Sequence, residues 1–228
     1  SCVYYGDSGP EVRDESYQRQ APHAHYYEQS KAEAHERALS IGQSGLPLVI
    51  VCPNIIVGPN DHAQWGYYLR LYINRLMPPF AFSPNMGFSP VHVDDVAAGI
   101  VLAGEKGRIG ETYILAGDAR RLREVLCIWS TKPGGLKVRA YLPIWLAKLL
   151  FAPMEPLQRM AGLPAFISRE VVVGSTINYL YSSAKAQREL GWRYRPPEAL
   201  WNDTVAGEMD LLAQRTKRDL ISRLKPVE

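Results

Sequence analysis

Short apolar runs alternate with longer amphipathic stretches along the first two thirds of the chain. Leu48–Cys52 is an unbroken apolar run, which is typical of a strand buried on both faces of a parallel sheet. Similar short runs predict strands at Val91–Val93, Thr112–Ala116 and Val138–Leu142, and residues 1–6 predict the end of a strand that enters a turn. Strands that alternate with helices indicate an α/β fold class with a parallel sheet.

The amphipathic stretches predict helices at about residues 26–41, 64–75, 94–103, 122–130, 182–191 and 197–214, and an apolar helix around Trp145. Gly42 and Gly45 are expected to end the first of these helices. Asp94 or Asp95 is expected to cap the third, because a side-chain carboxylate accepts hydrogen bonds from the free amides of a first turn. Ser182 is expected to cap a later helix in the same way.

The composition changes after Pro133-Gly134-Gly135, where a turn is followed by an apolar segment and then by helices. We therefore expect residues 1–130 to form a sheet-containing domain and residues 131–228 to form a mainly helical lobe. Basic residues between Arg215 and Lys225 are expected to line the solvated face of an amphipathic helical tail rather than to bind an anionic partner.

The composition excludes several classes of protein. The net charge of +3 is too small to indicate a nucleic-acid partner. The three cysteines, Cys2, Cys52 and Cys127, are far apart and show no CxxC spacing, which argues against a disulfide framework or a zinc site and favours a reducing, cytoplasmic location. The longest apolar stretch, 140–153, contains a proline and a lysine and is too short for a transmembrane segment.

Tyr27 and Lys31 form a YxxxK spacing on the first predicted helix. Side chains four positions apart lie on one face of a helix, so the phenol and the ammonium can point the same way. A nearby ammonium favours the ionised phenolate, and such a tyrosine can give a proton to a carbonyl or take one from an alcohol. Because the chain has 13 tyrosines, the alternative is a packed tyrosine beside a solvated lysine.

Two further segments carry candidate polar or backbone contacts. Ser1 lies at a predicted strand end, where a hydroxyl can donate a hydrogen bond to a substrate oxygen. The turn that contains Pro53, Asn54 and Ile56 follows a buried strand, and its backbone can approach a flat cofactor ring. The alternative for Ser1 is a terminal serine without a role, and the alternative for the turn is an ordinary strand end and loop.

Two other patterns are rejected as sites. His92 with Asp94 and Asp95 suggests a metal site, but capping explains an aspartate and no third ligand type is nearby. Gly104, Gly107 and Gly110 form a GxxGxxG that follows a predicted helix and precedes a predicted strand. A dinucleotide-binding loop requires the reverse order, so these glycines are expected to stop a helix and form a turn.

Taken in order, these motifs resemble the extended short-chain dehydrogenase/reductase superfamily, the epimerase/dehydratase group. The resemblance rests on Ser1 before Tyr5-Gly6, on the YxxxK and on three segments: PNIIVGP, VHVDDVAAGIVLA and SAKAQRELGWRYRP. The segment GLPLVIVCPNIIVGPND is similar to dihydroflavonol-reductase-like and hopanoid-associated epimerase-like proteins.

The resemblance implies the C-terminal part of a Rossmann-like doubly wound sheet with a helical substrate-binding lobe. It implies that Ser1, Tyr27 and Lys31 are catalytic, and that Tyr27, Lys31, Pro53, Asn54 and Ile56 contact NAD or NADP. The glycine-rich turn of this family is not found in the sequence, so about 100 or more residues are expected to precede Ser1 in a complete protein. A chain without them is expected to bind NAD or NADP weakly.

Three functions remain open. The first is an NAD(P)-dependent oxidoreductase that acts on a secondary alcohol or ketone. The second is a nucleotide-sugar epimerase or dehydratase, and the third is a non-catalytic interaction fragment. Apolar residues in the late lobe favour the first slightly, because they suit an apolar small-molecule substrate, although they can equally be core: Trp145, Leu149, Phe151, Met154, Met160 and Phe166. The resemblance is also compatible with a homodimer.

Overall fold

The structure is a computed structural model that describes residues 1–132, 135–151, 160 and 174–214. The chain divides into two compact units. Unit 1 comprises Ser1–Ile56, Gly87–Arg120 and Ile177–Pro197, and unit 2 comprises Val57–Met86, Arg121–Thr176 and Glu198–Glu228. The chain therefore passes between the units five times. These units are groups of segments that pack together. The expected domains, residues 1–130 and 131–228, stay a prediction.

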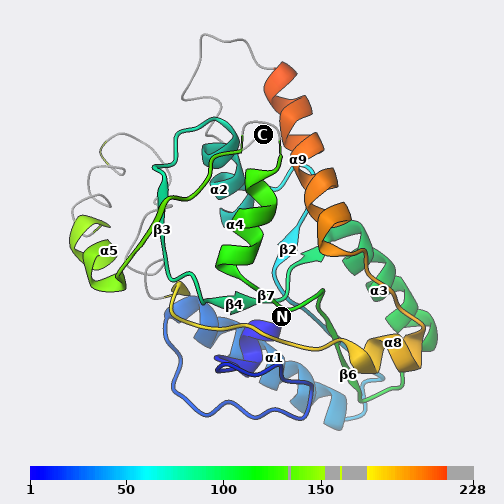
Figure 1. Ribbon diagram of the computed structural model, residues 1–228. Helices are drawn as coiled ribbons and strands as arrows, with labels where there is room; N and C mark the ends of the chain where they lie inside the picture. Colours follow the sequence, from blue (N-terminus) through cyan, green and yellow to red (C-terminus); the bar gives the residue numbers. More distant parts are fainter. Residues whose placement is uncertain (133–134, 152–159, 161–173, 215–228) are drawn as a thin grey trace. The chain divides into compact units, whose positions relative to one another are not determined.

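Unit 1 contains a parallel strand pair with helices around it. Its elements are the 3₁₀ helix η1 (Cys2–Tyr5), α1 (Tyr26–Gln43), β1 (Ile50–Pro53), β4 (Gly87–Phe88), β5 (Val91–His92), α3 (Val93–Lys106), β6 (Thr112–Leu115) and α8 (Ala184–Leu190). β1 pairs in parallel with β6, and Cys52 lies opposite Ile114. Figure 1 shows α3 and α8 side by side next to β6, as their contacts require.

The core of unit 1 forms where α3 and α8 pack against β6. Buried Tyr113, Leu115, Leu190 and Trp192 belong to one cluster. The Trp192 indole N–H donates a 2.7 Å hydrogen bond to the Asp95 carbonyl, so this polar group is satisfied inside the apolar cluster. A second cluster joins η1 to the strands through Cys2, Tyr5, Cys52, Ile114, Ala116 and Tyr181.

Unit 2 contains α2 (Gln64–Ile73), β3 (Phe80–Phe82), α4 (Leu122–Ser130), β8 (Ala140–Leu142), α5 (Ile144–Phe151) and, from Glu198 onward, α9 (Pro197–Gln214). β3 and β8 pair in parallel. Tyr72, Trp129 and Trp201 stack edge to face, with ring centroids 5.3 and 5.2 Å apart. The Arg70 guanidinium pairs at 2.6 Å with the fully buried Glu208 carboxylate. No helix in the described part of the chain is long and apolar enough to cross a membrane.

The α/β class with parallel strands is confirmed, and the helices expected at 64–75, 122–130 and 197–214 are present. The two-residue strands β2 (Ile56–Val57) and β7 (Arg120–Arg121) were not expected. The predicted strand at residues 1–6 is wrong, because Tyr4 N and Gly6 N donate to the carbonyls of Ser1 and Val3 and close a 3₁₀ helix.

The expected caps also need correction. His92 caps α3: its Nδ1 accepts a 3.2 Å hydrogen bond from Asp94 N, so neither Asp94 nor Asp95 is the cap. Ser183 occupies the N-cap position of α8, although the Ser182 hydroxyl does accept a 3.2 Å hydrogen bond from Ala184 N. The tail expected beyond residue 214 lies outside the described residues.

Candidate functional site

Tyr27 and Lys31 lie in the first two turns of α1, with their side chains on an open face of the helix. The Tyr27 side chain is 52% exposed and Lys31 is exposed. The Lys31 Nζ lies 5.4 Å from the centroid of the Tyr27 ring. The expected same-face geometry of the YxxxK is therefore confirmed. The alternative of a packed Tyr27 is wrong, because this residue is exposed, whereas the catalytic role of Tyr27 stays a prediction.

The neighbouring stripe of α1 fixes the helix in place. Its buried residues Glu28, Ala32 and His35 follow an i, i+4, i+7 spacing, which turns one stripe of the helix inward. The His35 ring stacks on Tyr4 of η1 with centroids 3.7 Å apart, and His35 Nδ1 lies 3.6 Å from the Cys52 thiol of β1. The open and the buried stripes are adjacent, so packing on one sets the direction of the other.

Ser1 is the N-cap of η1, and its Oγ accepts a hydrogen bond from Val3 N at 3.4 Å. That bond is long, and the hydroxyl hydrogen remains available for donation to another group. The Cys2 thiol donates to the Cys52 carbonyl at 3.1 Å. Since Ser1 precedes Cys2 and Pro53 follows Cys52, this contact brings the Ser1 segment beside the carboxyl end of β1.

The turn after β1 is held by two hydrogen bonds that Asn54 donates to other segments of unit 1. Asn54 N donates to the Leu115 carbonyl at 3.0 Å, and Asn54 Nδ2 donates to the Tyr179 carbonyl at 2.8 Å. The Asn54 side chain thus bridges two segments of unit 1. Pro53 is half-buried and Ile56 is 40% exposed. The expected contacts of Pro53, Asn54 and Ile56 with a cofactor stay predictions.

Buried phenols and thiols around η1 are neutral. Burial raises the pKa of Tyr5, Tyr181 and the Cys2 thiol well above their usual ranges, and it raises the pKa of Cys52. Neither thiol is therefore activated as a nucleophile. Among these groups, none combines exposure with a nearby ammonium as Tyr27 does.

Tyr179 is a neighbour of the site that the sequence analysis missed. It is half-buried, and its pKa is raised mainly by burial and then by the negative charge of Glu28. The Tyr27 phenol contributes a smaller electrostatic effect in the same direction. Nothing in the spacing of residues 177–181 connects this segment to a helix about 150 positions earlier, because this relationship depends on the fold alone.

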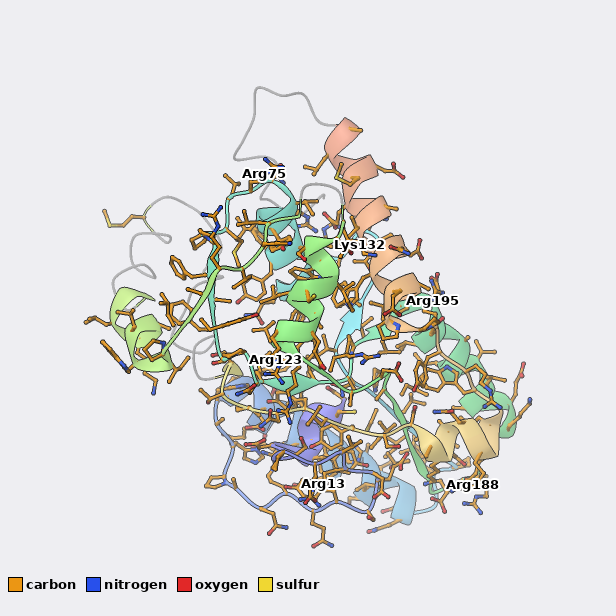
Figure 2. All side chains as sticks on the ribbon, in the orientation of Figure 1. Arg13, Arg75, Arg123, Lys132, Arg188 and Arg195 are labelled. Atoms are coloured by element: carbon orange, nitrogen blue, oxygen red, sulfur yellow. The ribbon has the colours of Figure 1, made fainter. Side chains whose placement is uncertain are left out.

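The segment around His92 is held by internal contacts. The Asp95 carboxylate accepts hydrogen bonds from the Arg195 guanidinium at 3.0 and 3.1 Å and from the Arg195 backbone N–H at 2.9 Å. Figure 2 labels this arginine. His92 caps α3 as described above. The Arg195 guanidinium also lies 3.6 Å from the Asp94 carboxylate. Contacts within unit 1 therefore engage all three residues that were weighed as a metal site.

The rejected glycine pattern has the structural roles that were expected. Gly104 lies within α3, Gly107 is the C-cap of that helix, and Gly110 has a φ of 87° in the turn that leads to β6. The order is helix, turn, strand. The next element after these glycines is β6, so they do not lead directly into a helix N-terminus that could receive a phosphate.

Several apolar residues of the late lobe face outward in unit 2. Trp145 and Leu149 of α5 are 63% and 66% exposed, and Met160 is 84% exposed. The interpretation of these three residues as core is wrong. The side chains of Phe151, Met154 and Phe166 lie outside the described residues.

Comparisons with known proteins give the same assignment from sequence and from fold. The protein named "Putative dihydroflavonol 4-reductase" of Synechocystis sp. is 34% identical over 190 residues, which are 78% of this chain and 53% of that protein. The match to the crystal structure of gox2253 covers 92% of this chain and 64% of the gox2253 chain, with 30% sequence identity and a TM-score of 0.73. This chain belongs to the extended short-chain dehydrogenase/reductase superfamily.

A third match shows the same fold at greater distance. The dTDP-glucose 4,6-dehydratase from Bacillus anthracis, solved in complex with NAD, covers 99% of this chain and 63% of its own at 18% identity, with a TM-score of 0.70. The Rossmann-like fold expected for this superfamily member is thereby confirmed. No family model matches the chain. The chain spans about half the length of the curated relative.

Proposed function

We propose that this chain supplies the catalytic residues of an NAD(P)-dependent oxidoreductase that interconverts a secondary alcohol and a ketone. The observation that carries the proposal is the Tyr27–Lys31 pair: an exposed phenol with an ammonium 5.4 Å from its ring, on a helix whose other face is locked against the Ser1 segment. The open phenol and ammonium fit a cofactor that presents ribose hydroxyls and a flat ring.

In the direction of reduction, Tyr27 donates its phenolic proton to the substrate oxygen. The Ser1 hydroxyl donates a hydrogen bond to the same oxygen and stabilises the negative charge that develops there. Lys31 stabilises the phenolate that remains, and its ammonium would hold the nicotinamide ribose of the cofactor. The nicotinamide, when bound, supplies or accepts the hydride at the substrate carbon.

A reductase is favoured over an epimerase or dehydratase by two observations. The Synechocystis relative, at 34% identity, carries a reductase name. The exposed Trp145, Leu149 and Met160 of unit 2 suit an apolar substrate better than a nucleoside diphosphate. An epimerase of this superfamily is expected to retain NAD through its cycle, whereas a reductase must release it.

The test uses the complete gene product that contains this sequence. Turnover of NADH and NADPH is measured with a panel of aryl and alkyl ketones for the wild type and for Tyr27→Phe. We expect the variant to lose about 10²–10⁴-fold in turnover, since that is the typical effect of proton transfer. Equal turnover of the two would refute the assignment of Tyr27. Stoichiometric NAD released on denaturation, together with epimerisation of a nucleotide sugar, would instead establish the epimerase.

A further inference from the structure

Arg19 connects two segments of unit 1 that each lie next to a proposed catalytic residue. Its Nη2 donates hydrogen bonds to the carbonyl oxygens of Val3 and Tyr4, each at 2.7 Å, and both residues belong to η1. Its Nη1 forms a 2.9 Å ion pair with Oε1 of Glu28, in the first turn of α1. One planar cation thus bridges the turn that follows the proposed catalytic serine and the helix that carries the proposed catalytic tyrosine.

The bridge is buried. The side chain of Glu28 is 2% exposed and that of Arg19 is 18% exposed. The second carboxylate oxygen of Glu28 accepts a 2.5 Å hydrogen bond from Ala24 N, just before the helix begins. Gly6 has a φ of 79°, and a Cβ there would lie 2.8 Å from Arg19 Nη1, so the absence of a side chain at Gly6 leaves room for the guanidinium.

We propose that Arg19 is a positioning residue that sets the position of the Ser1 hydroxyl relative to the Tyr27 phenol, a role that rests on the proposed function. Ser1 immediately precedes η1, and Tyr27 immediately precedes Glu28. Three directed bonds from one rigid fork fix both the distance and the angle between these segments. A lysine has the charge but lacks the fork, so it cannot make all three bonds in the same geometry.

Two pairs of charges offer a matched comparison. Arg13 pairs with Glu11 at 2.8 Å in the same loop, where the two side chains are 36% and 67% exposed, and Figure 2 labels Arg13. Arg13 also donates a 3.2 Å hydrogen bond to the Ser8 carbonyl, which belongs to neither η1 nor α1. We compare Arg19→Met, the neutral double variant Arg19→Met/Glu28→Gln, Arg19→Lys and the control Arg13→Met. Each is measured for thermal stability, kcat and KM in the complete gene product.

Arg19→Met leaves a buried carboxylate unpaired, so both stability and kcat should fall. The double variant removes that charge, so its stability should return toward the wild type. Its kcat should stay about 10²-fold below the wild type with little change in KM, since a displacement of about 1 Å costs that much. The kcat of Arg19→Lys should lie between that of the double variant and that of the wild type. Arg13→Met should keep the kcat of the wild type, whatever small loss of stability follows from its bond to Ser8. Recovery of kcat together with stability in the double variant would show a merely structural role and overturn the proposal.

A second readout does not depend on activity. The amides of Tyr4 and Gly6 are bonded to the carbonyls of Ser1 and Val3 within η1. Their hydrogen exchange should be about tenfold faster in the double variant and unchanged in Arg13→Met. If the wild type turns over no substrate, the proposed function fails while faster exchange still establishes the bridge. Unchanged exchange in the double variant overturns the proposal whatever the activity.

Discussion

The imidazole of His35 on α1 stacks on the phenol ring of Tyr4 in η1, with centroids 3.7 Å apart and planes 16° from parallel. His35 is 7% exposed, and burial lowers its pKa to about 4. The contact that fixes α1, the helix of Tyr27 and Lys31, against the Ser1 segment is thus made by a histidine that is neutral at physiological pH. Protonation would place an uncompensated charge inside that contact.

Stability should therefore depend on pH through His35. The folded-state pKa lies below the ordinary value of about 6.5, so the unfolded chain binds the proton first as the pH falls. The contribution of the neutral ring is complete above about pH 6.5 and is lost progressively down to about pH 4. Between pH 7 and pH 4.5 the wild type should lose about 2–3 kcal/mol more than His35→Phe, which keeps the stacking but cannot titrate.

Urea unfolding of the two proteins at several pH values measures this difference directly. Because other groups titrate in both proteins, only the difference between the two curves reports on His35. Parallel curves across the whole range would show that the His35 ring does not carry the pH dependence.

Two glycines of α3 should respond in opposite ways to the same substitution. A Cβ at Gly99 would lie 2.9 Å from Trp192 Nε1 and would also contact Leu115, whereas a Cβ at Gly104 meets no atom within 4 Å. We expect Gly99→Ala to lower the free energy of unfolding by about 1–3 kcal/mol, because overpacking a tight core forces neighbours apart. Gly104→Ala should raise it by about 0.5–1 kcal/mol, because alanine is the better helix former.

Chemical denaturation of the two variants is the measurement, with each serving as the control for the other. A loss of stability in Gly104→Ala would mean that this glycine has a packing or binding role, contrary to its place on the open face of α3. Equal effects at both sites would contradict the packing of Trp192 against Gly99.

The sequence predicted the elements that have a regular pattern of apolar residues. The 3.6-residue pattern predicted α2, α4 and α9 to within about two residues at each end, and the apolar runs predicted β1 and β6. It missed the 3₁₀ helix at Cys2–Tyr5, because an apolar run of four residues is compatible with a strand or with a short helix. There the decision comes from tertiary contacts, namely the Cys2 thiol bonded to the Cys52 carbonyl and the Tyr4 ring on His35.

The candidate site was predictable only in part for the same reason. Tyr27 and Lys31 are four positions apart, so helix geometry alone aligns them. Arg19 reaches the site through an ion pair with a residue 9 positions away, and Tyr179 is influenced by the charge of a residue about 150 positions away. No local sequence pattern records either relationship. His92 was placed correctly beside the helix start, but its role as the cap depends on the orientation of its ring, not on its position in the chain.

Lys31 should be required for turnover. With its ammonium near the Tyr27 ring, Lys31→Met removes the only positive charge that the pair contains. We expect kcat in the complete gene product to fall at least about 10²-fold, because both phenolate stabilisation and ribose binding are lost. Lys31→Arg keeps the charge and should retain part of the activity.

The exposed Lys106, at the end of α3, provides the control. Lys106→Met changes the net charge by the same amount and should leave kcat unaltered. If Lys31→Met and Lys106→Met behave alike, the ammonium of Lys31 takes no part in the reaction.

The 228-residue chain alone should bind NAD or NADP no more tightly than roughly millimolar. Most recognition of a dinucleotide comes from the pyrophosphate at a helix N-terminus and from the adenosine ribose. The proposed contacts here, from Tyr27, Lys31 and the Pro53 turn, involve the nicotinamide end. A few hydrogen bonds of about 1 kcal/mol each must offset at least about 4 kcal/mol of lost translational and rotational freedom. Isothermal titration with both cofactors measures the affinity, and Lys31→Met shows whether any heat comes from this site. A micromolar dissociation constant would mean that the chain holds a pyrophosphate site elsewhere, and the turn at Gly107 and Gly110 would be the first place to look for it.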